Sequence, residues 1–137
     1  CDWSSDVCSS DLDEQIQTNL VGLIWLTKQA LPHVRDCIIS LASGAGSHPV
    51  RDLSVYCATK YGVRGFSEVL AMENTGLRVY TVSPTMTSTE MTDYHGMPPE
   101  NVAKVIVRTA KDGYDQPSGS DIKVWEVLNK HLEEGWD

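Results

Sequence analysis

Tyr56 and Lys60 stand four residues apart in a stretch whose apolar spacing predicts a helix over residues 55–72. Side chains four apart on a helix lie one above the other, so the phenol and the ammonium would share a face. A phenol can protonate an alkoxide or deprotonate an alcohol, but its ordinary pKa of about 10 is too high for a base at neutral pH. A nearby cation favours the phenolate, and Lys60 would supply that cation. The alternative is an exposed tyrosine beside a solvated lysine.

Two further residues give this pair a chemical context. Ser43 follows the β-branched run at 37–41, which is typical of a buried parallel strand, at the carboxyl end of that strand. Its hydroxyl could hydrogen-bond a substrate oxygen and stabilise negative charge that develops there. Asn19 lies in an apolar helix predicted over residues 13–34, where its amide could hold a water that links Lys60 to solvent. Together these groups suit proton transfer coupled to hydride transfer at a carbonyl or alcohol carbon.

The elements that must position these residues alternate between helix and strand. After a Ser/Gly/Pro-rich loop at 42–52 and the helix that carries Tyr56, the patterns predict a strand at 77–82, a loop at 85–98, a helix at 100–111, a strand at 120–125 and a short helix to 134. Such alternation indicates a parallel sheet with crossover helices. Three strands are few for this architecture and would leave an edge open. We therefore predict an α/β fold that is a partial doubly wound parallel sheet, comprising its last three strands and their helices.

Residues 1–12, CDWSSDVCSSDL, have neither helical nor strand periodicity. One back-translation of these residues resembles a sequencing-library adapter in frame, so we interpret 1–12 as an artefactual, disordered leader and 13–137 as the folded part. Without the leader, 16 acidic and 11 basic residues remain, a net charge of −5 in place of −8. This acidic balance argues against nucleic acid or an anionic membrane surface as a partner. No apolar run approaches the roughly 20 residues of a membrane span.

Metal and disulfide chemistry are not indicated. Outside the leader, Cys37 and Cys57 are isolated, and the four histidines are scattered without metal-ligand spacing. We therefore predict no metal site and a cytoplasmic location.

The helix 13–34 carries apolar residues around much of its circumference, so we predict that two of its faces are buried.

Three segments closely resemble the short-chain dehydrogenase/reductase (SDR) family. They are NLVG at 19–22, IISLASGAG at 38–46 and YCATKYGVRGF at 56–66. The resemblance covers residues 13–82 and extends more loosely to 110. It implies a Rossmann-type domain with a catalytic tetrad of Asn19, Ser43, Tyr56 and Lys60, in which Lys60 also bonds the nicotinamide ribose.

The resemblance also implies NAD or NADP as cofactor in an intact parent protein. The residues expected to contact it are Tyr56, Lys60, Pro84, Thr85, Met86, Thr87 and Thr89. Thr85 stands where the family usually has glycine, so a side chain there could crowd the cofactor. The family's Gly-rich turn, which cradles a pyrophosphate, would precede Asn19, and no such turn precedes it in this sequence. We therefore expect residues 13–137 to be the carboxyl-terminal part of an SDR Rossmann-type domain.

The leading functional prediction is an NAD(P)-dependent oxidoreductase that moves a hydride between nicotinamide and a small-molecule carbonyl or alcohol, with Tyr56 as acid/base. The parent is expected to be a homodimer or homotetramer that associates through helices 13–34 and 55–72. Two alternatives stay open. The missing Gly-rich turn favours a noncatalytic fragment or dimerisation module, and Tyr-x-x-x-Lys also suits an epimerase or dehydratase. The substrate is not predicted, because residues 85–98 and absent upstream residues would build most of its pocket.

Overall fold

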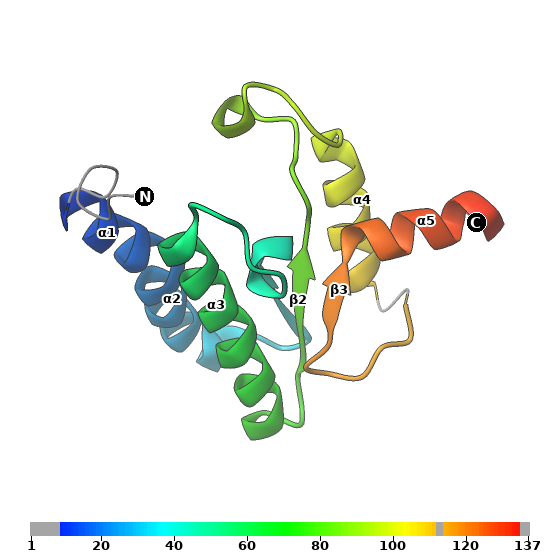
Figure 1. The fold of residues 1–137 in the computed structure, drawn as a ribbon. Helices are drawn as coiled ribbons and strands as arrows, with labels where there is room; N and C mark the ends of the chain where they lie inside the picture. Colours follow the sequence, from blue (N-terminus) through cyan, green and yellow to red (C-terminus); the bar gives the residue numbers. More distant parts are fainter. Residues whose placement is uncertain (1–8, 112–113, 135–137) are drawn as a thin grey trace.

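A three-stranded parallel sheet lies at the centre of the computed structural model, which describes residues 9–111 and 114–134 (Figure 1). In spatial order, the strands are β1 (Cys37–Leu41), β2 (Arg78–Ser83) and β3 (Asp121–Lys123). Leu41 pairs with Val82, and Val82 pairs with Ile122. Because both pairings are parallel, the carboxyl ends of all three strands meet at one edge. The predicted α/β fold with a parallel sheet is confirmed.

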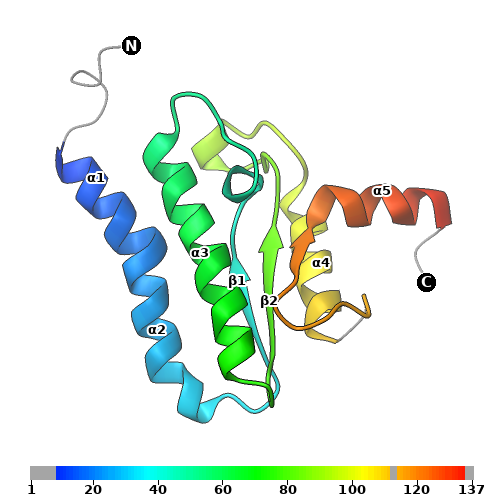
Figure 2. The same ribbon diagram turned by 60° about the horizontal axis from the view of Figure 1, so that its bottom comes forward.

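The amino-terminal helix is one continuous helical stretch with a π-helical turn inside it. Its parts are α1 (Ser9–Ile16), the π-helical turn (Gln17–Val21), α2 (Gly22–Ala30) and a final 3₁₀ turn (Leu31–His33). It runs alongside α3 (Ser54–Glu73), as Figure 2 shows. The two helices approach closely at Gly62, where a Cβ would lie 2.9 Å from Leu20 Cδ2. The absence of a side chain at Gly62 lets the two helices pack at this distance.

Two expectations about this helix differ from the structure. The helix begins at Ser9, so the last four residues of the expected leader are helical, and residues 1–8 lie outside the described residues. The prediction of two buried faces is wrong, since Trp25 and Leu26 are 55% and 71% exposed. The helix packs against α3 on one side only, and no other element of the described structure covers its outer side.

Helices cover both faces of the sheet, and each face has its own apolar cluster. On the α3 side the buried residues are Leu70, Ala71 and Val79. On the other side, α4 (Pro99–Ala110) contributes to the cluster of Tyr80, Val82, Val102, Val105, Ile122 and Val124. The alternation along β2, with Val79 toward one helix layer and Tyr80 toward the other, is what a strand between two layers requires. This burial fixes β2, and therefore the sheet edge beyond it.

The last strand is shorter than predicted. The ladder between β2 and β3 ends at Ser83 and Lys123, and α5 (Val124–Glu134) begins at the next residue. The residue after Ser83 is a proline, which has no N–H to continue the ladder. Trp125 therefore lies in a helix and not in the predicted strand at 120–125. No helix within the described ranges is both long and apolar enough to traverse a lipid bilayer.

Candidate active site

Ser43 lies just past the carboxyl end of β1, at the edge where all three strands end. Its backbone is extended, and its Oγ accepts a hydrogen bond from the N–H of Ala45 at 3.2 Å, which caps a short 3₁₀ turn, Gly44–Gly46. The turn is held from two sides. The N–H of Gly46 donates to Ser43 O at 2.8 Å, and the N–H of Gly44 donates to Pro84 O, after β2, at 2.8 Å. Ser43 is thus placed by the ends of two strands.

Tyr56 and Lys60 lie in the first two turns of α3, and both side chains are half-buried. The Nζ of Lys60 donates to Leu41 O, the last residue of β1, at 3.2 Å, and lies 5.6 Å from the centroid of the Tyr56 ring. Burial lowers the pKa of Lys60 below its ordinary value. The ammonium therefore contacts both the phenol ring and the strand end that leads to Ser43.

Asn19 lies in the π-helical turn, and π turns inside α-helices are frequent at functional sites. Its Nδ2 donates to Thr59 Oγ1 at 3.3 Å, and Thr59 Oγ1 donates to Tyr56 O at 2.8 Å. Asn19 is half-buried. The structure joins Asn19 to the helix of Tyr56 and Lys60 through Thr59, a buried residue that the sequence analysis did not single out.

A family model described as "short chain dehydrogenase" matches residues 3–98. The chain belongs to the short-chain dehydrogenase family. Alcohol dehydrogenase 1 of Ceratitis capitata is 34% identical over 125 residues, which cover 83% of this chain and 46% of that relative. D-erythrulose reductase of Gallus gallus is 34% identical over 106 residues, which cover 76% of this chain and 39% of that relative. The chain spans about half the length, or less, of the curated relatives it matches.

A solved structure with the same arrangement of elements is that of 3-ketoacyl-(acyl-carrier-protein) reductase from Brucella melitensis, complexed with NADH. Its TM-score is 0.80 at 20% identity, over 88% of this chain and 59% of that one. This likeness establishes the Rossmann-type fold of the short-chain dehydrogenase chain described here.

The segment that follows β2 in this short-chain dehydrogenase folds back on itself. Pro84 contacts the Ser43 turn through its carbonyl, whereas Thr85 and Met86 are exposed. Met86 O accepts from the N–H of Met97 at 2.9 Å, and Thr87 and Met97 form an isolated bridge. Of the residues expected to contact a cofactor, Pro84 therefore joins Ser43 and Lys60 at the sheet edge. Thr85, Met86, Thr87 and Thr89 lie in the loop beyond it, where Thr87 is half-buried and the other three are exposed.

An ionic cluster beside the Ser43 turn was not anticipated from the sequence. Arg64, one helical turn after Lys60, donates from Nη1 to Gly46 O at 2.7 Å, and its Nε lies 3.1 Å from Asp121 Oδ2. Asp121 Oδ1 accepts from Thr81 Oγ1 and Ser83 Oγ at 2.8 and 2.6 Å. A signal for Arg64 existed in its spacing of four from Lys60, but nothing in the sequence paired it with Asp121.

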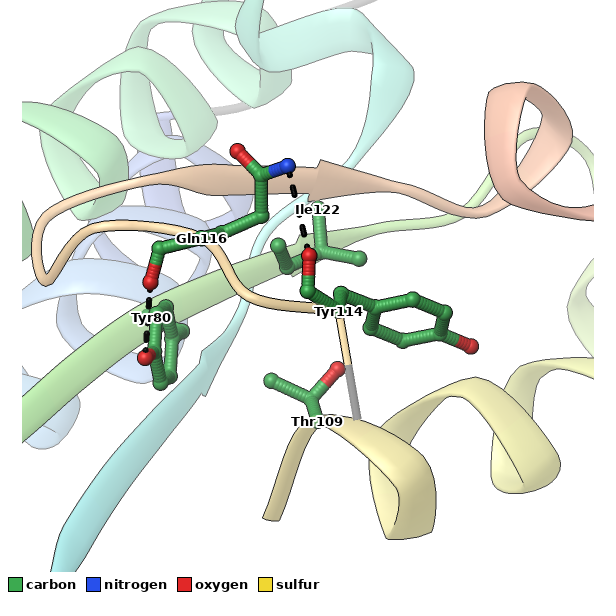
Figure 3. A pocket seen from close by; sticks show the side chains of 5 residues that line it. All are labelled: Tyr80, Thr109, Tyr114, Gln116 and Ile122. Atoms are coloured by element: carbon green, nitrogen blue, oxygen red, sulfur yellow. Dashed lines mark hydrogen bonds between the residues drawn. The ribbon is translucent and has the colours of Figure 1, made fainter. Parts of the chain in front are cut away.

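Two cavities of the described structure lie on the side of the sheet where β3 meets α4 and α5. Figure 3 shows a cavity of about 10 Å³ between β2, β3 and the end of α4, which is at the lower limit for one water. It is lined by Tyr80, Thr109, Tyr114, Gln116 and Ile122, and Tyr80 Oη donates to Gln116 O at 3.0 Å. A wider groove of about 450 Å³ runs between the end of α4 and α5 and is lined by charges of both signs. Neither cavity is lined by Ser43, Tyr56 or Lys60. Within the described residues, no group of three or more His, Cys, Asp or Glu could hold a metal ion.

Proposed function

We propose that this chain carries the proton-transfer site of an NAD(P)-dependent oxidoreductase that interconverts a small-molecule carbonyl and an alcohol. The observation that carries the proposal is the position of the Lys60 ammonium, 3.2 Å from Leu41 O and 5.6 Å from the Tyr56 ring centroid. Ser43 follows Leu41 by two residues. The elements that carry this hydroxyl, phenol and cation meet at the carboxyl edge of a parallel sheet, where α/β folds bind their ligands, and this supports the proposal.

Each of these side chains has a distinct task in the proposed reaction. Tyr56 donates its phenol proton to the oxygen of the carbonyl as that oxygen gains negative charge, and accepts the proton back in the reverse direction. Lys60 favours the phenolate by its charge. The acceptor side of Ser43 Oγ already binds the N–H of Ala45, so its O–H is directed elsewhere and can donate to the substrate oxygen.

Asn19 is proposed to take part in returning the proton. Its Nδ2 is engaged with Thr59, so its amide oxygen remains as the acceptor for a water that reaches Lys60. The bond to Thr59 would hold that oxygen in place relative to α3.

The residues present fit the nicotinamide ribose end of a dinucleotide. Lys60 has three N–H donors. One donates to Leu41 O, so two remain for the hydroxyls of a ribose. Pro84, Thr85, Met86, Thr87 and Thr89 continue from the same sheet edge, and the three threonines among them carry hydroxyls. When bound, the nicotinamide supplies or accepts the hydride. The Brucella reductase that shares this fold is complexed with NADH, which supports the same class of cofactor here.

The decisive test is Tyr56→Phe in the intact parent protein. We expect kcat for carbonyl reduction to fall by roughly 100- to 10,000-fold, because the phenylalanine ring keeps the shape but cannot move a proton. Turnover is measured from the absorbance of the reduced nicotinamide, over a panel of small ketones, aldehydes and alcohols with both NADH and NADPH.

The matched control is Tyr61→Phe, which removes an exposed phenol from the same helix and should leave kcat unchanged. If Tyr56→Phe kept full turnover, the proposed acid/base role would be wrong. A wild-type parent that binds NAD(P)H without reducing any of the panel would instead favour the noncatalytic alternative.

We further propose that the parent self-associates through α2 and α3. The outer faces of these helices carry large exposed apolar side chains, including Trp25, Leu26, Val69 and Met72. Apolar faces of this kind on a folded chain commonly mark protein interfaces.

A further inference from the structure

Arg64 links the turn after Ser43 to the helix that carries Tyr56 and Lys60. Its guanidinium makes two contacts in different directions, from Nη1 to Gly46 O at 2.7 Å and from Nε to Asp121 Oδ2 at 3.1 Å. The bond to Gly46 O has hydrogen-bond geometry, whereas the contact with Asp121 is an ion pair without hydrogen-bond alignment. Arg64 therefore bonds Gly46 to α3 and lies against Asp121 of β3.

Asp121 is itself held in place. Its side chain is 9% exposed, and its Oδ1 accepts from Thr81 Oγ1 and Ser83 Oγ of β2 at 2.8 and 2.6 Å. The carboxylate thus connects β3 to the last residues of β2, next to the Pro84 carbonyl that binds the Ser43 turn. Four segments meet at this cluster: the Ser43 turn, α3, β2 and β3.

The turn also contacts α3 closely at the position of Lys60. A Cβ on Gly46 would lie 2.8 Å from Lys60 O, so the two backbones are in contact there. The N–H of Gly46 donates to Ser43 O at 2.8 Å. A displacement of Gly46 from α3 would therefore be transmitted to Ser43 through one hydrogen bond and two intervening residues.

We propose that Arg64 is a positioning residue that sets the place of Ser43 relative to Tyr56 and Lys60 through its bond to the Gly46 carbonyl. This inference rests on the proposed oxidoreductase function. A partly buried ion pair adds little net stability, because removing both charges from water offsets most of their attraction. The contribution of Arg64 is therefore expected in geometry, and a shift of about 1 Å at a reacting centre can cost roughly 100-fold in rate.

The test compares two variants of the intact parent protein. Asp121→Asn removes the ion pair and leaves the hydrogen bond from Arg64 to Gly46 O. The double variant Arg64→Met/Asp121→Asn removes the ion pair and the hydrogen bond, and it leaves no unpaired charge. We expect the double variant to lower kcat by roughly 10- to 100-fold with KM for the nicotinamide cofactor unchanged. Asp121→Asn should lose much less. Hydrogen exchange of the amides of residues 45–47 should accelerate in the double variant only.

Equal kcat losses in the two variants would overturn the proposal, because the ion pair and not the Gly46 bond would then be responsible. Unchanged exchange at residues 45–47 in the double variant would overturn it as well. Arg64→Lys covers the case in which the double variant does not fold, since lysine keeps a charge beside Asp121 but lacks the planar fork that places Nη1 at Gly46 O and Nε at Asp121. It should stay folded and lose kcat. If the wild-type parent shows no turnover, the oxidoreductase proposal fails, and the exchange comparison still decides the role of Arg64.

Discussion

Two regions meet at the carboxyl edge of the sheet and are held in opposite ways. The turn 43–46 is joined to β1, β2 and α3, and Ala45 and Gly46 are buried. Most hydrogen bonds of the loop 86–97 run within it, among them Ser88 N to Met97 O at 2.8 Å and Ser88 Oγ to Tyr94 O at 2.7 Å. Its Met91 is 87% exposed.

The turn 43–46 and the loop 86–97 meet two different requirements of the proposed active site. Side chains that transfer a proton need fixed distances, and burial against several elements supplies them. A segment that closes on a substrate has to move, and segments with few buried contacts have the lowest local stability. In the proposed function, the exposed Met91 and Tyr94 of the loop would make adaptable contacts with an apolar part of a ligand.

The largest expected effect comes from filling the space at Gly46. Gly46→Ala places a Cβ 2.8 Å from Lys60 O, a backbone atom that cannot move aside without shifting α3. We expect the free energy of unfolding to fall by about 1–3 kcal/mol, as for other overpacked sites. Urea unfolding measures it.

The control for this variant is Gly65→Ala in the same helix, where an added Cβ meets nothing within 4 Å. It should raise the free energy of unfolding by about 0.5–1 kcal/mol, because alanine favours the helix over glycine. Equal tolerance of alanine at both glycines would show that the turn is not held tightly against α3.

A smaller and more local effect is expected in the loop. Gly96 has a φ of +116°, and a Cβ there would clash with the Met86 carbonyl, so Gly96→Ala must open the loop. Limited proteolysis should cut within residues 86–97 faster. The midpoint of global unfolding should shift less than for Gly46→Ala, because most of the loop's hydrogen bonds run within it. A global loss as large as that of Gly46→Ala would remove the distinction between the two regions.

The smallest effect concerns the pH dependence of stability. Burial lowers the pKa of Lys60 in the folded state, so between the folded and unfolded pKa values the unfolded chain binds more protons. Stability contributed by this group therefore rises with pH across that window, and below it the cost of burying the charge is present in full. Lys60→Met should flatten the rise in a series of urea unfolding curves taken from neutral to alkaline pH.

The relevant quantity is the difference between wild type and Lys60→Met. Burial raises the pKa of Tyr114, which makes stability fall as pH rises, and this contribution cancels between the two proteins. Parallel curves would mean that Lys60 is not desolvated in the folded protein.

Local periodicity made much of this molecule predictable. The strands at 37–41 and 77–82 and the helix at 55–72 are confirmed to within one residue at each end, because packing in the core imposes a regular apolar pattern on each element. Where an outside contact set a boundary, prediction was less accurate. The end of β3 depends on Pro84, the residue just after β2, which lies about 40 positions away in the sequence. The assignments of Asn19, Ser43, Tyr56 and Lys60 to catalysis stay predictions.

By itself, the sequence determined the order of elements and which side chains share a helix face, as Tyr56 and Lys60 do, because these follow from spacing along one element. Only the tertiary structure decided that Lys60 contacts the end of β1, that Asn19 contacts Thr59 and that Arg64 joins Gly46 to Asp121. Gly46 and Arg64 are 18 residues apart, and Asn19 and Thr59 are 40 apart. Contacts at such separations depend on how the chain crosses between layers and packs, and no local repeat encodes that path.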